Sequence, residues 1–148
     1  MKIGFTGCGN MGSAMMRGII ASGKCAAENI MASDTLPEAL RRRKEELGIL
    51  TATDNREVAE FAEVLFLSIK PQYYQEVIAQ IRNLDLQEKI IVTIAPGKTL
   101  KWLEEQFEKP VKIIRTMPNT PAMVGEGMMG MCPNANVSED DLSLVQDI

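Results

Sequence analysis

Three glycines near the start of the chain have the spacing of a phosphate-binding turn. Gly7, Gly9 and Gly12 follow a short apolar run and precede a segment typical of a helix. In such a G-x-G-x-x-G pattern the first glycine permits a tight turn, the second lets a pyrophosphate approach the backbone, and the third lets the helix pack closely on the strand. The helix is expected to begin near Asn10, with its N–H groups and positive dipole end facing the phosphates. The pattern predicts a dinucleotide site, with a purely structural turn as the alternative.

The composition is that of an ordinary globular protein. The chain has 148 residues and a net charge of −4, with 45% hydrophobic and 24% charged residues, which fits one domain with its own core. It has no basic block, no apolar run of about 20 residues and no signal peptide. Neither nucleic acid nor a membrane is therefore expected as a partner, and the expected location is the cytoplasm.

Histidine is absent, which excludes a histidine-based triad or a histidine general acid within these residues. The three cysteines, Cys8, Cys25 and Cys132, are scattered and form no metal-spaced pair, so no metal site is expected. Cys8 lies inside the glycine turn, where a small side chain suits the crowding. A reactive thiol there is the less favoured interpretation.

Apolar segments and helix-like segments alternate along the chain. After a first strand that ends at the glycine turn, strands are expected over residues 29–33, 49–53, 64–69, 89–94 and 111–114. Helices are expected over residues 13–22, 38–47, 55–62, 75–81 and 100–107. This alternation predicts a Rossmann-type, doubly wound and mainly parallel α/β sheet, forming one domain over residues 1–148.

The last part of the chain is less regular. Two prolines exclude a helix interior over residues 115–121. The methionine-rich residues 127–132 are interpreted either as a further strand or as an apolar docking surface. Ser138 is a good helix start, but the chain stops at Ile148 without a helix-stop signal, and this ending is interpreted as a cut.

Four predicted strand ends carry distinctive residues. Because ligands of open α/β sheets bind beyond the carboxyl ends of the strands, these residues and the loop over 117–121 are expected to share one rim. Each stretch alone is simplest as a turn, but together behind the glycine pattern they predict a cofactor trough. The strand ends are residues 7–11, 33–35, 68–71 and 94–97.

Residue 34 bears on the choice between NAD and NADP. An acidic residue at about this distance beyond the glycines usually bonds the ribose 2′-hydroxyl and favours NAD. Ser33 and Thr35 are hydroxyl donors that could instead hold a 2′-phosphate, helped by Asn55 and Arg56. The charge of Asp34 opposes that phosphate if the side chain points into the pocket, but not if it caps the next helix. These residues alone leave both cofactors open.

Lys70 is a candidate for a catalytic acid at this rim. Because lysines are usually exposed, it is interpreted as a solvated lysine that closes a strand, with a backbone that could still touch the cofactor. Trp102, Tyr73 and Tyr74 are expected to pack helices or to cover a rim.

Four stretches, taken in order, resemble the N-terminal half of pyrroline-5-carboxylate reductase. Its most specific parts here are Asn10-Met11 and the Met-Pro-Asn-Thr-Pro stretch at 117–121. The resemblance implies the last step of proline biosynthesis, in which NAD(P)H gives a hydride to the imine carbon of 1-pyrroline-5-carboxylate and forms L-proline. The four stretches are residues 7–12, 68–71, 94–97 and 115–121.

The resemblance also implies cofactor contacts. The turn would hold the pyrophosphate, Ser33 and Asn55 would lie near the adenosine ribose and its 2′-phosphate, and the later strand ends would line the route to the nicotinamide. Ser33 tilts the choice to NADP, with NAD possible, and Pro96 departs from the alanine that is more usual there. The full predicted set is Thr6, Gly7, Cys8, Gly9, Asn10, Met11, Ser33, Asp34, Asn55, Ser68, Ile69, Lys70, Pro71, Ile94, Ala95, Pro96 and Asn119.

Members of this family have a helical C-terminal domain that dimerises and supplies most of the substrate site. That half is not among these residues, so a nucleotide site is expected here with poor or no turnover, catalytic residues stay unassigned, and the full-length form is expected to be a homo-oligomer. A β-hydroxyacid dehydrogenase and a non-catalytic NAD(P)-binding module remain as alternatives. Lys70-Pro71 and residues 117–121 favour the reductase.

Overall fold

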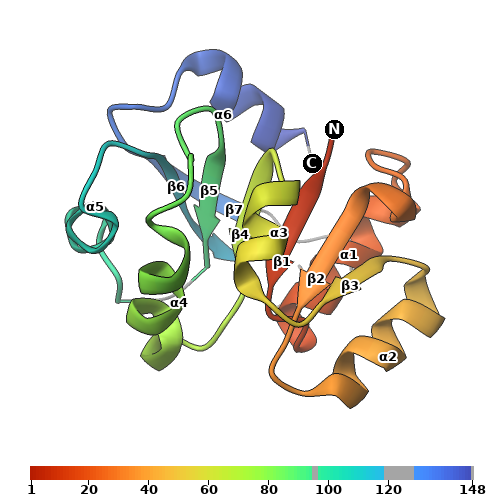
Figure 1. Ribbon diagram of the computed structural model, residues 1–148. Helices are drawn as coiled ribbons and strands as arrows, with labels where there is room; N and C mark the ends of the chain where they lie inside the picture. Colours follow the sequence, from red (N-terminus) through yellow and green to blue (C-terminus); the bar gives the residue numbers. More distant parts are fainter. Residues whose placement is uncertain (95–96, 119–128, 148) are drawn as a thin grey trace.

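The computed structural model describes residues 1–94, 97–118 and 129–147, which form a seven-stranded sheet with helices on both faces (Figure 1). The strands are β1 (Ile3–Thr6), β2 (Ile30–Ser33), β3 (Leu50–Ala52), β4 (Val64–Leu67), β5 (Ile90–Thr93), β6 (Lys112–Pro118) and β7 (Met129–Pro133). The α-helices are α1 (Asn10–Ala21), α2 (Pro37–Leu47), α3 (Asn55–Phe61), α4 (Tyr74–Ile81), α5 (Leu100–Phe107) and α6 (Glu139–Gln146), with 3-10 turns at Ala27–Asn29 and Pro71–Tyr73. In this described part of the chain, no helix has both the length and the apolar character needed to cross a membrane.

The strand order is β3-β2-β1-β4-β5-β6-β7. The neighbours from β3 to β6 are parallel, and β7 runs antiparallel to β6. Strands β2 and β3 follow β1 on one side of the sheet, and β4 lies on the other side of β1. The order therefore reverses between β1 and β4, which is where open sheets of this kind bind ligands beyond the carboxyl ends of their strands.

Each face of the sheet has its own apolar core, because side chains alternate along a strand. In β4, Val64 and Phe66 belong to the core shared with α1, α2 and α6, whereas Leu65 and Leu67 belong to the core shared with α3, α4 and α5. The strand is thus covered on both sides, which accounts for its continuous apolar sequence. Phe66 also stacks on Phe5 of β1, with ring centroids 4.8 Å apart.

Local signals set several helix ends, including the start predicted at Ser138. Asp54 caps α3 by accepting from the Arg56 N–H, and Thr99 caps α5 by accepting from the Trp102 N–H. Ser138 caps α6 through a reciprocal capping box. Helix α2 ends at Gly48, whose φ of 77° lies in the left-handed region that glycine adopts freely.

The largest difference from the predicted elements lies in β6. A strand was expected over residues 111–114 with a loop after it, but β6 continues to Pro118, because it pairs with β7 from Ile114 to Pro118. The backbone of Met117 and Pro118 therefore lies in a strand, and the prediction that these two residues belong to a rim loop is wrong. The further strand expected within residues 127–132 is confirmed as β7, and residues 119–121 lie outside the described residues.

Candidate functional site

The glycine turn lies at the point where the strand order reverses, between β1 and α1. Gly7 has a φ of 97°, and a Cβ there would lie 2.7 Å from the Ser68 carbonyl oxygen. A Cβ on Gly12 would lie 2.9 Å from Ser68 Oγ, so this glycine lets α1 approach the end of β4. Gly9 is exposed, and a Cβ there would meet nothing within 4 Å. The predicted structural roles of Gly7 and Gly12 are thus confirmed, and Gly9 leaves open space beside the backbone.

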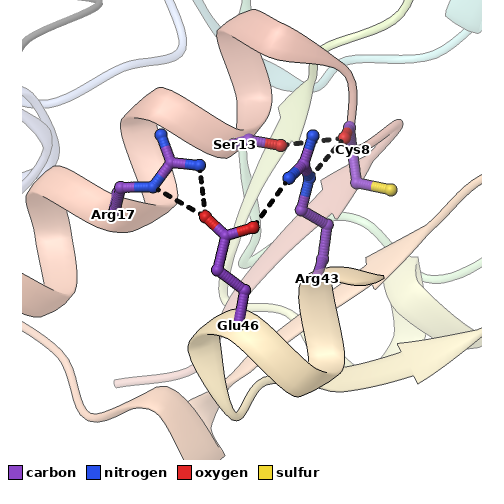
Figure 2. A network of polar contacts seen from close by, with 5 residues as sticks. All are labelled: Cys8, Ser13, Arg17, Arg43 and Glu46. Atoms are coloured by element: carbon purple, nitrogen blue, oxygen red, sulfur yellow. Dashed lines mark hydrogen bonds and ion pairs between the residues drawn. The ribbon is translucent and has the colours of Figure 1, made fainter. Parts of the chain in front are cut away.

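Side chains from other elements hold the turn at Cys8. The Cys8 N–H donates to Asp34 Oδ2 at 3.0 Å. The Cys8 carbonyl accepts from Ser13 Oγ at 2.9 Å and from Arg43 Nε at 3.3 Å, as Figure 2 shows. Both the N–H and the carbonyl of Cys8 are therefore hydrogen-bonded within the protein.

The start of α1 presents unpaired N–H groups. Gly9 is the N-cap residue, and no side chain caps the helix, so the first N–H groups of α1 lack partners within the helix. Within the described residues the Gly9 N–H has no hydrogen-bond partner either. Gly9 and Asn10 are exposed and Met11 is half-buried. These donors, at the positive end of the helix dipole, have the character of an anion site.

A polar groove opens beside the ends of β2 and β3. Ser33 Oγ donates to Asn55 Oδ1 at 2.6 Å, and Asn55 Nδ2 donates to Gln80 Oε1 at 2.7 Å. Arg56 is exposed and lies 3.6 Å from Asp54. Hydroxyl, amide and guanidinium groups of this kind bind phosphate. The groove has a volume of about 630 Å³ and is lined by Thr35, Thr53, Asp54, Asn55, Arg56, Ala79, Gln80 and Asn83.

Asp34 faces backbone donors. Its Oδ2 accepts from the Cys8 N–H, and its Oδ1 accepts from the Leu36 N–H at 3.0 Å. Leu36 is the N-cap residue of α2, and Asp34 is not among the residues that line the groove. Helix α2 has no side-chain cap, so the alternative in which Asp34 caps this helix is wrong. Its carboxylate instead bonds to the backbone just before α2 and to the glycine turn.

The ends of β1, β2 and β4 meet at the turn. The Gly7 N–H donates to the Ser33 carbonyl at 2.7 Å. Ser68 Oγ donates to the carbonyls of Thr6 and Gly7, at 3.1 and 2.7 Å. These hydrogen bonds bring together four of the predicted site residues from three separate strand ends.

The end of β5 is joined to the end of β4 by Tyr74. Its hydroxyl donates to the Leu67 carbonyl and accepts from the Ile94 N–H at 3.2 Å. Burial raises the pKa of Tyr74, so the hydroxyl keeps its proton at neutral pH. Tyr74 therefore joins the end of β4 to the residue that follows β5.

The remaining predicted residues lie along the same rim or outside the described residues. Ile69 and Ile94 are half-buried, and Lys70 and Pro71 are exposed. The exposure of Lys70 agrees with its interpretation as a solvated lysine. Ala95, Pro96 and Asn119 lie outside the described residues, so their predicted contacts stay predictions.

The Cys8 thiol is protonated at neutral pH. Burial, the nearby charge of Asp34 and a hydrogen bond to its carboxylate together raise the pKa of Cys8 to about 12. Because the thiolate is the reactive form, this agrees with the interpretation of Cys8 as an inert small side chain. In the described ranges, no group of three or more histidine, cysteine, aspartate or glutamate side chains could hold a metal ion.

Four residues of this region were not identified as site residues from the sequence, namely Ser13, Arg43, Tyr74 and Gln80. A serine on the buried face of α1 is a weak signal for a hydrogen bond to the backbone. Arg43 lies in a run of four basic residues, and nothing in that run distinguishes it from its neighbours. Tyr74 was expected to pack helices, which it does, but its bridging role depends on where β4 and β5 separate.

The family of this chain follows from its similarity to known sequences. The sequence model of the family described as NADP oxidoreductase, coenzyme F420-dependent, matches residues 2–97. The chain belongs to this family. The match runs from β1 to the segment after β5, so it contains the glycine turn, the groove and the Tyr74 bridge.

Proteins similar to this chain include pyrroline-5-carboxylate reductases. The Escherichia coli protein is 39% identical over 147 residues, which are 99% of this chain and 55% of that protein. A solved reductase structure from Coxiella burnetii has a TM-score of 0.93 and 31% identity, covering 99% of this chain and 54% of that one. A Plasmodium falciparum pyrroline carboxylate reductase with NADP bound has a TM-score of 0.88 and 31% identity, covering 99% and 53%.

The chain thus spans about half the length of the curated relatives it matches. The resemblance to pyrroline-5-carboxylate reductase expected from the sequence motifs is confirmed as a similarity over nearly the whole chain. The Rossmann-type α/β sheet expected from the alternation of elements is also confirmed.

Proposed function

We propose that residues 1–148 form one NAD(P)-binding domain of a pyrroline-5-carboxylate reductase, with NADP favoured and NAD also accepted. The observation that carries this proposal is the placement of the unpaired N–H groups of α1 at the reversal of strand order, beside the polar groove. A similar protein was solved with NADP bound, and the description of the family names NADP.

The residues at the rim fit a dinucleotide. The N–H groups of Gly9, Asn10 and Met11 would receive the pyrophosphate at the positive end of α1. Ser33 and Asn55 would hold the adenosine ribose and its 2′-phosphate, since Asn55 lines the groove and accepts a hydrogen bond from the buried Ser33 hydroxyl. Asp34 directs both carboxylate oxygens to backbone N–H groups, which weakens the argument for NAD based on its position.

The nicotinamide end is proposed to lie along the later strand ends. Residues 68–71 and 94–96 would line its route, with Asn119 near the carboxamide. When bound, the reduced cofactor supplies the hydride that converts the imine carbon of 1-pyrroline-5-carboxylate to the C–H carbon of L-proline. The contribution of this chain is to bind and orient the cofactor, with Tyr74 joining Leu67 at the end of β4 to Ile94 after β5. We assign no proton donor.

The proposal extends to the whole protein. We infer a homo-oligomeric full-length protein from the resemblance to pyrroline-5-carboxylate reductase, whose C-terminal domain dimerises. A cytoplasmic location is proposed as the default expectation from the sequence. The partner is a small molecule, and neither nucleic acid nor a membrane is proposed.

Titration of this chain with NADPH and NADH tests the cofactor site. Ser33→Ala is expected to weaken NADPH about tenfold and NADH much less, because a hydrogen bond to a charged phosphate is lost only with NADPH. Ser143→Ala, on the exposed surface of α6, serves as the control and is expected to change neither affinity. Failure of wild type to bind either nucleotide would contradict the proposal. Equal losses of affinity for NADPH and NADH in Ser33→Ala would show that Ser33 does not hold the 2′-phosphate.

Turnover is tested separately. Because the relatives are about twice as long as this chain, we expect the chain alone to oxidise NADPH slowly or not at all in the presence of 1-pyrroline-5-carboxylate. The full-length protein is expected to reduce 1-pyrroline-5-carboxylate to L-proline. Rapid reduction of a keto acid to a hydroxy acid, without reduction of the cyclic imine, would contradict the proposed substrate.

A further inference from the structure

The two peptide groups on either side of Cys8 are held by four side chains. In the peptide before Cys8, the N–H donates to Asp34 and the carbonyl accepts from Ser68. In the peptide after Cys8, the carbonyl accepts from Ser13 and Arg43. Arg43 contributes from α2, thirty-five positions along the chain, and its guanidinium is the one member of this set that carries a positive charge.

Arg43 is itself held in place by an ion-pair network (Figure 2). Its side chain is 14% exposed, and its Nη1 lies 3.0 Å from Glu46 Oε2. The other oxygen of Glu46 accepts from Arg17 of α1, at 2.6 Å from Nη2 and 3.1 Å from Nε. The hydrogen bond from Arg17 lowers the pKa of Glu46, so the carboxylate is ionised at neutral pH. Glu46 thus bridges two helices and directs the Nε–H of Arg43 to the turn.

This arrangement determines the direction of the Gly9 N–H. The Cys8 carbonyl and the Gly9 N–H belong to the same trans peptide plane and point in opposite directions. Because Ser13 and Arg43 hold the carbonyl on the protein side, the Gly9 N–H faces the open side of the turn. The Cys8 N–H is occupied by Asp34, so Gly9 supplies the first N–H of the turn that is open to an anion.

We propose that Arg43 is a positioning residue for the cofactor pyrophosphate. Together with Ser13 it fixes the Cys8 carbonyl, and thereby aims the Gly9 N–H at the phosphate, while Glu46 and Arg17 keep Arg43 in place. Arg43 acts through the turn and makes no contact with the phosphate itself. This inference rests on the proposed function, because it names how that site is shaped.

The first test compares Arg43→Met with Arg42→Met, which removes the same charge from the same helix at an exposed position. Arg43→Met is expected to weaken both NADPH and NADH about tenfold, because a hydrogen bond from a charged donor is lost. Arg42→Met is expected to change either affinity less than twofold. Adenosine 2′-monophosphate, which has no pyrophosphate, is expected to bind both variants as it binds wild type.

Equal effects of the two substitutions on NADPH would overturn the positioning role, because only charge would then matter. A matching loss with adenosine 2′-monophosphate would also overturn it, because the whole site would then be disturbed.

The second test needs no nucleotide. In the free chain, amide hydrogen exchange at Cys8 is expected to speed up several-fold in Arg43→Met, while Leu65 in the middle of the buried sheet keeps its protection. Unchanged amide exchange at Cys8, or an equal rise in exchange at Leu65, contradicts the proposed positioning of the turn by Arg43. If wild type binds no nucleotide but Cys8 loses protection in Arg43→Met as expected, Arg43 does position the turn and the proposed function fails.

Discussion

The hydroxyl of Tyr74 offers the sharpest test of how the rim is built. It lies where β4 and β5 separate, and it joins the Leu67 carbonyl to the Ile94 N–H. Tyr74→Phe removes this one oxygen and keeps the ring that packs in the core formed with α3, α4 and α5. The neighbouring Tyr73 is 49% exposed, so Tyr73→Phe makes the same chemical change without a buried bridge.

The expected loss follows from the two groups left behind. A buried polar group without its partner costs about 1–3 kcal/mol. Leu67 is fully buried and should incur that cost, whereas Ile94 is half-buried and its N–H can find water. We therefore expect Tyr74→Phe to lower the free energy of unfolding by about 2 kcal/mol, out of a total of about 5–15 kcal/mol for a domain of this kind. Tyr73→Phe should stay within about 0.5 kcal/mol of wild type.

Urea denaturation followed by circular dichroism measures this difference. With a slope of about 2 kcal/mol per molar urea, the midpoint should fall by about 1 M for Tyr74→Phe with the slope unchanged. A Tyr74→Phe midpoint equal to that of Tyr73→Phe would refute the reasoning, because the bridge would then contribute nothing. Burial raises the pKa of Tyr74, so the contribution should be constant below the unfolded-state pKa of about 10 and should decline above it.

Three further outcomes are expected. Gly4→Ala should destabilise the chain by about 1–3 kcal/mol in the same urea assay, because the new Cβ would lie 2.8 Å from a side-chain carbon of α3. Iodoacetamide at pH 8 should modify the exposed Cys132 well before the buried Cys8, whose pKa is raised to about 12, and peptide mass spectrometry showing the reverse order would contradict this. Burial alone would raise the pKa of Asp141, but hydrogen bonds from the start of α6 and from Lys112 outweigh it and lower the pKa. The contribution of Asp141 is therefore present above its unfolded-state pKa of about 4 and lost as pH falls through the lower folded value, so the stability difference between wild type and Asp141→Asn should shrink in acid.

Sequence patterns that act over a few residues predicted much of the fold. The helix start at Ser138 was predicted and is confirmed, because a capping side chain bonds to a backbone N–H only two or three residues away. The strand predicted over residues 64–69 is also a local pattern, since its apolar run is continuous and β4 is buried on both faces. The end of β6 was missed, because its last residues are held by pairing with β7 and have no signal of their own.

The spacing of Gly7, Gly9 and Gly12 was enough to predict the turn between β1 and α1, because the left-handed φ of Gly7 and the close packing of Gly12 depend on the absence of a side chain. The spacing of apolar residues also predicted the order of strands and helices. The orientations of Asp34 and Arg43 could not be predicted in this way, since each side chain bonds to Cys8 from a different part of the chain. The physical reason is that such bonds depend on how whole helices pack against the sheet, and residues 26 and 35 positions away carry no local signal for that placement.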